Sequence, residues 1–491
     1  MLFNSYIFLF VFLPVTWILF RLASTFRLTR LAIIILMVAS LVFYSYWNPV
    51  FVLLILVSIG FNYTWGRLLE AKAPPSRFLL FIGVAMNLSV IGYFKYANFL
   101  MANVCAAFDL QWSERDIFLP LGISFFTFQQ IAYLVDCYRG ITRERNVAQY
   151  ALFVSFFPQL IAGPIVHHEE MISQFRRLRT YAMNYRNLAM GLGFLSLGLL
   201  KKLVIADSLS PWVKDAFDTT DALTFVEAWG AALAYTFQIY FDFSAYSDMA
   251  VGLGKLFNID LPMNFNSPYK ATSIIDFWKR WHMTLSRFLR DYVYIPLGGN
   301  RRGVLRRYLN LLATMLIGGL WHGAAWTFVF WGGLHGVLLC INHAARRLCR
   351  RFSFSVPDWI GWMLTFGSVV FGWVFFRAGS FGRAVSIVKG MVGLNGIVIG
   401  GGDLPDFLAD ALRALHVTIG KPAVWHYFGP HQRNLLIVAT VVSLCLPSTW
   451  QWVHRQVGDR PTWQSAAGIA VALCVSVLFL GRVTEFLYFQ F

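Results

Sequence analysis

Residues 276–335 read DFWKRWHMTLSRFLRDYVYIPLGGNRRGVLRRYLNLLATMLIGGLWHGAAWTFVFWGGLH, and this segment decides both the class of the fold and the first functional candidate. Its first half is basic and aromatic and contains His282, whereas its second half is an almost uninterrupted apolar run that contains His322. A full charge at membrane depth costs roughly 2.5 kcal/mol or more, so ionisable side chains there usually have a function. His322 is therefore the first candidate. A buried histidine that donates its ring N–H to a backbone carbonyl is the simpler alternative.

The composition of the whole chain places this segment in a membrane. Hydrophobic residues make up 58% of the 491 residues, aromatic residues 17% and charged residues only 13%, with a mean hydropathy of +0.59. These values exclude a soluble globular domain. The net charge of +17 comes from Lys and Arg in short loops between apolar runs. Such a pattern reports membrane orientation, so we expect no nucleic-acid partner.

Successive apolar runs separated by charged clusters predict an all-α polytopic membrane protein with about ten to twelve transmembrane helices. Assigning the positive clusters to the cytoplasm places both termini on the outer face. Residues 2–20 lack a basic leader and a small-residue cleavage site, so we expect them to stay as the first span. An acidic segment from Asp207 to Asp221 is interpreted as an outer loop. No soluble domain or repeat is visible, which predicts one membrane domain over residues 1–491.

Two other apolar segments do not fit simple spans. Residues 151–166 contain Pro158 and a Gly-Pro pair, with cations on both flanks, which favours a re-entrant hairpin. Broken backbone at membrane depth must be buried in protein or line a wet cavity, so this element predicts an interior cavity. A helix on the membrane surface is the alternative. Residues 308–342 also have arginines on both flanks, so two short limbs that meet near His322 are expected to form a second hairpin.

Acid–base chemistry is the activity that His322 suggests. An imidazole has an unperturbed pKa of about 6.5, so it can take a proton from a hydroxyl at neutral pH. Gly319 and Gly323 beside it allow a helix or a substrate to approach closely. The functional interpretation of His322 is therefore a general base that faces a cavity.

His282 lies in a segment that helical spacing would divide into an aromatic face and a cationic face. The aromatic face would contain Trp278, Trp281 and Leu285. The cations are Lys279, Arg280, Arg287 and Arg290. A cationic helix beside a buried histidine suits a donor molecule with several phosphates. Ordinary positive-inside topology, with binding of membrane-lipid headgroups, is the alternative.

Polar residues in the segment QIYFDFSAYSDMAVGLG, residues 238–254, form a third group. Asp242 and Asp248 lie there in apolar, aromatic surroundings and need partners. They are expected either to orient catalytic groups or to pair with buried arginine, and we favour a structural network near the active site. The six cysteines and the histidines have no metal-like spacing, so we expect no metal site and no bound cofactor.

Five motifs carry a family resemblance: WKRWHMTLSRFLRDYVYIPLGGNR, GGLWHGAAWTFVFWGGLHG, SFFPQLIAGPI, the segment 238–254 and the closing FLYFQF. Together they resemble the membrane-bound O-acyltransferase (MBOAT) family over nearly the whole chain. They are most similar to its bacterial branch with the alginate O-acetylation membrane subunit and the teichoic-acid D-alanylation membrane protein. The resemblance implies a ring of tilted helices, with re-entrant and short helices, around a thin central tunnel that is reached from both faces.

The resemblance also implies roles for individual residues. His322, in the WHG element, matches the catalytic histidine of the family, and His282 matches the second member of the proposed site. The ending F-x-Y-x-x-F implies that Tyr488 is an acyl relay, which takes the acyl group from the donor and passes it to a serine of a partner. The alternative for this aromatic tail is an anchor at the membrane interface.

The function that the resemblance implies is acyl transfer across a bacterial inner membrane. Acetyl-CoA would be the cytoplasmic donor substrate, and alginate or another extracytoplasmic polysaccharide would be the final recipient. The implied partners are a periplasmic SGNH-type acetyltransferase and a polysaccharide synthesis and export complex. A secondary transporter or flippase, or a scaffold that recruits the synthase, is the alternative.

Overall fold

The computed structural model describes residues 1–71, 74, 76–219, 222–399, 418–419, 430–481 and 486–487, and these are mainly helical. The α-helices are α1 Leu13–Thr25, α2 Thr29–Ser45, α3 Val50–Ala71, α4 Arg77–Ile91, α5 Ala97–Ala107, α6 Ile123–Tyr138, α7 Val147–Ser155, α8 Phe157–Leu160, α9 His168–Phe175, α10 Tyr185–Leu200, α11 Asp207–Lys214, α12 Phe225–Leu256, α13 Ile274–Trp278, α14 Met283–Leu289, α15 Val304–His322, α16 Trp326–Arg351, α17 Asp358–Arg377, α18 Phe381–Met391, α20 Pro430–Leu444, α21 Thr449–Val453 and α22 Trp463–Phe479. The π-helical turns are η1 Phe8–Phe12, η2 Gly92–Tyr96, η4 Lys201–Ala206, η5 Asp215–Thr219, η7 Arg290–Tyr294 and η9 His454–Asp459, and the 3-10 turns are η3 Leu178–Tyr181 and η6 Pro268–Lys270. Two short strands, β1 Val398–Ile399 and β2 Thr418–Ile419, pair in parallel.

Six helical segments of the described chain are long and apolar enough to cross a membrane. They are Phe8–Thr25, Val50–Ala71, Arg77–Ala107, Tyr185–Thr219, Trp326–Arg351 and Asp358–Arg377. A bent pair, His431–Leu444 and Thr449–Asp459, would make a seventh span, and Thr29–Ser45 and Trp463–Phe479 are shorter apolar helices. The chain is thus a helical, multi-pass membrane protein, while a total of ten to twelve spans stays a prediction.

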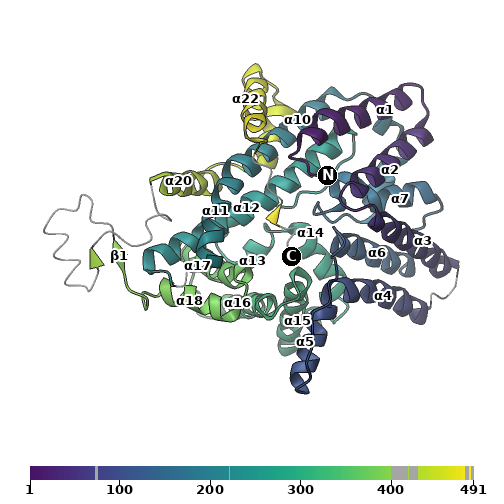
Figure 1. The fold of residues 1–491 in the computed structure, drawn as a ribbon. Helices are drawn as coiled ribbons and strands as arrows, with labels where there is room; N and C mark the ends of the chain where they lie inside the picture. Colours follow the sequence, from purple (N-terminus) through teal and green to yellow (C-terminus); the bar gives the residue numbers. More distant parts are fainter. Residues whose placement is uncertain are drawn as a thin grey trace.

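Helix α12 forms a buried axis through the molecule. It has 32 residues and is buried along most of its length. It contacts α10, α11, α17 and α18, and in Figure 1 it lies between the helices of the N-terminal part and the group α16 to α18. Because other helices surround it, α12 can carry polar side chains that pair with protein groups instead of facing lipid.

The interrupted segment 151–166 is buried in protein, as predicted for broken backbone. Helix α7 ends within it, the short α8 follows, and the chain then continues without helix to α9. Side chains of other elements accept hydrogen bonds from its backbone: Ser40 Oγ from Phe157 N at 3.1 Å, and Thr284 Oγ1 from Ile165 N at 3.0 Å. Every residue of the segment is buried, which contradicts the alternative of a helix on the membrane surface.

The acidic segment after residue 206 is helical up to residue 219, so the prediction of a loop there is wrong. Elements α10, η4, α11 and η5 follow one another without a break over Tyr185–Thr219. The carboxylate of Asp207 is buried and lies 2.8 Å from Nζ of Lys202, five residues earlier in the π-helical turn η4. This ion pair within the helix compensates the buried charge, so the aspartate does not force the chain out to solvent. Asp221 lies outside the described residues.

Helices α15 and α16 form a hairpin with His322 at its turn, as predicted, but α16 has 26 residues and is long enough to cross a membrane, so the prediction of two short limbs is wrong. The two helices pack so closely that a Cβ atom on Gly319 would overlap the carbonyl oxygen of Phe328, and one on Gly332 would overlap the carbonyl oxygen of Met315. Only glycine permits this approach of two backbones. The hairpin therefore fixes the position at which α15 ends.

Candidate active site

The imidazole of His322 lies in an aromatic shell. The residue is 4% exposed, and its ring centroid lies 4.9 Å from that of Trp321, 5.3 Å from Trp331 and 5.1 Å from Phe376, with steep angles between the rings. A buried aromatic shell excludes most water, which would otherwise screen charges. Electrostatic interactions at this imidazole are therefore stronger than they would be at a surface.

The end of α15 is held by two side chains from the π-helical turn η2. Nζ of Lys95 donates hydrogen bonds to the carbonyl oxygens of Trp321 at 2.7 Å and His322 at 3.0 Å. The hydroxyl of Tyr96 donates to the carbonyl oxygen of Leu320 at 2.7 Å. The last carbonyl groups of a helix have no partner within the helix, so these contacts satisfy them. Lys95 and Tyr96 thereby hold the backbone that carries His322.

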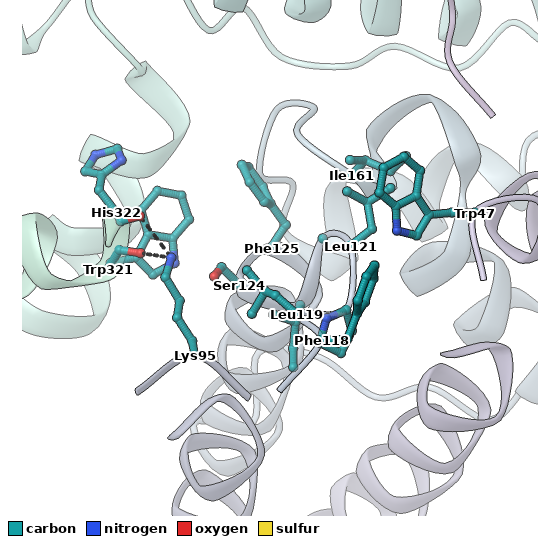
Figure 2. Close-up of a pocket in the computed structure, with 13 residues that line it drawn as sticks. Trp47, Lys95, Phe118, Leu119, Leu121, Ser124, Phe125, Ile161, Trp321 and His322 are labelled. Carbon is teal, nitrogen blue, oxygen red and sulfur yellow. Dashed lines mark hydrogen bonds between the residues drawn. The ribbon is translucent and has the colours of Figure 1, made fainter. Parts of the chain in front are cut away.

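A cavity of about 270 Å³ lies beside this end of α15 (Figure 2). Lys95, Trp321 and His322 line one side of it. Other residues that line it are Trp47, Phe118, Leu119, Leu121, Ser124, Phe125 and Ile161. In Figure 2 the ammonium group of Lys95 meets the two carbonyl oxygens, while the imidazole of His322 points away from the lysine. The cavity therefore contains a cation directly beside the histidine backbone.

His282 lies in a sharp break between α13 and α14. Its φ of 42° and ψ of 54° fall in the left-handed region, which costs of order 1–3 kcal/mol for a residue other than glycine. The helix ends at Trp278 and a new one begins at Met283, so the prediction of one helix with an aromatic face and a cationic face is wrong. The side chain of His282 at this break is completely buried.

Asn264 fixes the protonation of the His282 ring. Its Oδ1 accepts hydrogen bonds from Thr284 N at 3.2 Å and from Thr284 Oγ1 at 2.9 Å, which identifies this atom as the acceptor. The 3.2 Å contact between Oδ1 and Nδ1 of His282 therefore requires a proton on Nδ1. On its other side, Asn264 Nδ2 donates to Ser247 Oγ of α12 at 3.2 Å. In the neutral imidazole of His282 the lone pair is therefore on Nε2.

The structure brings the two predicted histidines together. The ring centroids of His282 and His322 are 6.5 Å apart, although the residues are 40 positions apart in the sequence. The ring of Phe243 from α12 packs edge-on against His282 at 4.8 Å. A third buried histidine, His335, accepts a hydrogen bond from Trp278 Nε1 at 3.3 Å. Helices α12, α14 and α15 thus meet at one buried site.

The predicted donor-binding cations are mostly engaged with carboxylates of the protein. The ion pairs are Arg280–Asp276 at 2.9 Å, Arg287–Glu170 at 2.6 Å and Arg290–Asp291 at 2.7 Å. Lys279 is exposed. A phosphate group would have to replace a carboxylate at each of these arginines, so their role in donor binding stays a prediction.

The two aspartates of α12 have lysine partners, not the expected arginine. Asp242 Oδ1 and Asp248 Oδ2 each lie 2.7 Å from an ammonium group, that of Lys202 and that of Lys201 respectively. The neighbouring Ser247 reaches His282 through Asn264, as described above. Asp242 and Asp248 therefore pair with lysines and Ser247 reaches His282 through Asn264, while a single polar network that joins these groups stays a prediction.

Only part of the C-terminal tail can be placed. Phe486 and Leu487 are described, whereas Tyr488 lies outside the described residues. Phe486 is 1% exposed and packs edge-on against Tyr246 at 5.0 Å. This burial contradicts the alternative of an interfacial anchor for Phe486.

Sequence reasoning missed Lys95 and Asn264. Lys95 interrupts an apolar run, and the argument applied to His322 would have singled it out as a lone cation at membrane depth. Asn264 gives no such signal, because it lies in the polar stretch MNFNSP. Within the described part of the chain, no three His, Cys, Asp or Glu side chains are grouped to hold a metal ion.

Comparison with known proteins matches these features to a family. The model of the membrane-bound O-acyltransferase (MBOAT) family matches residues 141–381. The chain is 41% identical to a peptidoglycan O-acetyltransferase of Helicobacter pylori over 100% of this chain and 98% of that protein. It is 43% identical to a probable alginate O-acetylase AlgI of Azotobacter vinelandii over 77% of this chain and 75% of that protein. A teichoic acid D-alanyltransferase of Streptococcus thermophilus is 29% identical over 46% of this chain and 57% of its own length. The chain therefore belongs to the membrane-bound O-acyltransferase family and is an O-acyltransferase.

Proposed function

We propose that this protein takes acetyl from acetyl-CoA at the cytoplasmic face of a bacterial inner membrane and passes it across that membrane for O-acetylation of an extracytoplasmic glycan. The observation that carries the proposal is the buried pair His282 and His322, with ring centroids 6.5 Å apart. A single reacting group between the rings would contact both. The relatives named O-acetyltransferases support acetyl as the acyl group.

His322 acts as the general base of the transfer. It removes the proton of an acceptor hydroxyl, whose oxygen forms a bond to the thioester carbonyl carbon while the carbon–sulfur bond breaks. The imidazolium then returns the proton to the departing thiolate, so the histidine is regenerated. His282, with its lone pair on Nε2 and its Nδ1–H held by Asn264, keeps the reacting groups oriented beside His322.

Tyr488 is the acceptor hydroxyl in the relay form of this mechanism. Its phenol oxygen receives acetyl and passes it to a serine of a periplasmic SGNH-type acetyltransferase, within a polysaccharide synthesis and export complex. The burial of Phe486, two residues earlier, supports a tail that enters the protein.

The glycan and the topology complete the proposal. Similarity over the full chain to a peptidoglycan O-acetyltransferase makes peptidoglycan the first recipient to test, with alginate the second. Residues 1–491 form one membrane domain of ten to twelve spans around a thin central tunnel, and both termini are periplasmic. Lys279, Arg280, Arg287 and Arg290 lie on the cytoplasmic side and bind the phosphates of the donor, and membrane lipids surround the ring.

Acetyl transfer in proteoliposomes tests the proposal. Radiolabelled acetyl-CoA is supplied, and protein-bound label is compared among the wild type, His322→Ala, Tyr488→Phe and the control His431→Ala. His431 is an exposed histidine on α20 and should behave as the wild type. Loss of label in both test variants supports the base and the relay. Loss in His322→Ala alone supports the base and removes the relay. If His322→Ala acquires protein-bound label as fast as the wild type, the catalytic proposal fails and transport or scaffolding becomes the better interpretation.

A further inference from the structure

A buried cluster of three charges lies next to the active site but takes no part in the mechanism above. Nζ of Lys202 lies 2.8 Å from Asp207 Oδ1 and 2.7 Å from Asp242 Oδ1. The three side chains are 1%, 6% and 4% exposed, respectively. The trio contains two carboxylates and one ammonium group, so it has an excess negative charge. A buried carboxylate is stable only with additional hydrogen-bond donors.

The C-terminal tail supplies a donor and an aromatic ring to this cluster. Leu487 N donates a hydrogen bond to Asp242 Oδ2 at 3.0 Å, on the oxygen that does not contact Lys202. The ring centroid of Phe486 lies 4.5 Å from Nζ of Lys202, within the range of a cation–π interaction. Two successive tail residues thus contact the two members of one ion pair. The backbone N–H of Leu487 meets the carboxylate of Asp242, and the aromatic ring of Phe486 meets the ammonium group of Lys202.

The same helix holds the tail and the active-site histidine. Asp242 of α12 binds Leu487, and the next residue, Phe243, packs against His282 at 4.8 Å. One turn later, Tyr246 contacts the ring of Phe486. Any shift of the tail along α12 therefore changes its position relative to His282.

We propose that the Lys202–Asp242 ion pair, supported by Asp207, is the dock of the C-terminal tail, and that it positions the tail relative to His282 and His322. These are positioning residues, since none of them contacts the reacting groups in the mechanism above. The docking itself rests only on the contacts just described. Its consequence for acyl transfer rests on the proposed relay through Tyr488, which is bonded to Leu487.

A cavity lies beside the hydrogen bond between Leu487 and Asp242. It has a volume of about 230 Å³, and its lining includes Lys202, Asp207, Asp218, Asp242, Arg377 and Leu487. Leu487 is half-buried at this wall, whereas Phe486 is buried, so release of the tail must also withdraw the ring of Phe486 from its contact with Tyr246.

Digestion of the intact, purified protein with a carboxypeptidase measures docking without reference to activity. The matched variants are Leu487→Pro, which removes the donated N–H, and Leu487→Ala, which keeps it. Leu487→Pro should lose C-terminal residues about tenfold faster than the wild type, as expected for the loss of one hydrogen bond to a charged group, whereas Leu487→Ala should be nearly unchanged. Asp242→Asn provides a second test of the same bond, and should accelerate digestion less than Leu487→Pro because the amide oxygen still accepts.

The results separate this proposal from the proposed function. Equal digestion of Leu487→Pro and Leu487→Ala overturns the dock, whatever their activities. Faster digestion of Leu487→Pro together with loss of protein-bound acetyl supports both the dock and the relay. Faster digestion with unchanged acetyl transfer supports the dock and refutes the relay. If Asp242→Asn is poorly folded, as thermal unfolding would reveal, the two Leu487 variants decide alone.

Discussion

Lys95 offers the sharpest test of how the active site is held. Lys95→Met keeps the length and most of the apolar stem of the side chain but removes both hydrogen bonds to the carbonyl oxygens of Trp321 and His322. Each hydrogen bond from a charged donor contributes about 1.5–3 kcal/mol, and relief of the buried ammonium group offsets part of that sum. A net loss of about 2–3 kcal/mol in holding His322 corresponds to a fall in kcat of about 30- to 150-fold.

Tyr96→Phe is the matched control from the same π-helical turn. It removes one neutral hydrogen bond, to the carbonyl oxygen of Leu320, and leaves His322 bound by Lys95. A loss of about 1 kcal/mol predicts a fall in kcat of only about fivefold.

The assay is the initial rate of acetyl transfer in proteoliposomes at several donor concentrations, with thermal unfolding to verify that the variants are folded. A positioning role predicts a lower kcat and an unchanged KM in Lys95→Met. The reasoning is refuted if kcat stays near that of the wild type. A raised KM with an unchanged kcat would instead make Lys95 a ligand contact in the cavity of Figure 2.

Two further predictions concern the groups around the site. Asn264→Ala should lower the free energy of unfolding by about 3 kcal/mol, because the side chain makes three hydrogen bonds to Thr284 and His282. It should also abolish most of the activity, because the tautomer of His282 is no longer fixed. Ser247→Ala removes only the hydrogen bond on the other side of the amide and should retain activity, so equal rates for the two variants would contradict the tautomer argument. In the loop between α6 and α7, burial works against the charge of Glu144, but the imidazole of His168 at 3.5 Å, a hydrogen bond from the Asn146 backbone and the guanidinium of Arg176 hold its pKa below the ordinary value. This stabilisation is present at neutral pH and is lost as the pH falls through the lowered pKa, so the difference in melting temperature between the wild type and Glu144→Gln should shrink on acidification; a difference that does not change with pH would contradict it.

The sequence was a good guide wherever one segment carried its own signal. The proline and glycine interruptions of residues 151–166 predicted broken, buried backbone, and the paired arginine flanks predicted the hairpin at His322. Family resemblance, not spacing, paired His282 with His322, and the structure brings their rings together.

The failures share a physical cause, which is that they depend on contacts between distant segments. Lys95 is 227 positions from His322, whose carbonyl it binds. The acidic stretch after residue 206 is the exception, because Lys202 lies only five residues before Asp207 in the same helical segment, and this local ion pair lets the helix continue past the buried charge. The break at His282 depends on Asn264, 18 positions earlier, which binds both the ring and the start of α14. No local preference predicts a left-handed histidine.

The two lysines that bind the His322 backbone and the C-terminal tail both lie in π-helical turns. Lys95 lies in one π-helical turn, η2, and Lys202 in another, η4. A π-helical turn inserts an extra residue and rotates the side chains that follow, and such turns are frequent at functional sites. A π-helical turn alone does not identify a functional site, because η1 is also π-helical and contains only the apolar sequence FLFVF.

What distinguishes η2 and η4 is that each turn directs an ammonium group inward, one to the backbone of His322 and the other to the pair that binds the tail. A charge that faced lipid, or an aspartate of α12 without its lysine, would be costly in a membrane, so the inward direction of both lysines matters. The two π-helical turns and the left-handed His282 thus lie at the three points where the structure holds the backbone of His322, the ring of His282 and the tail residue Leu487.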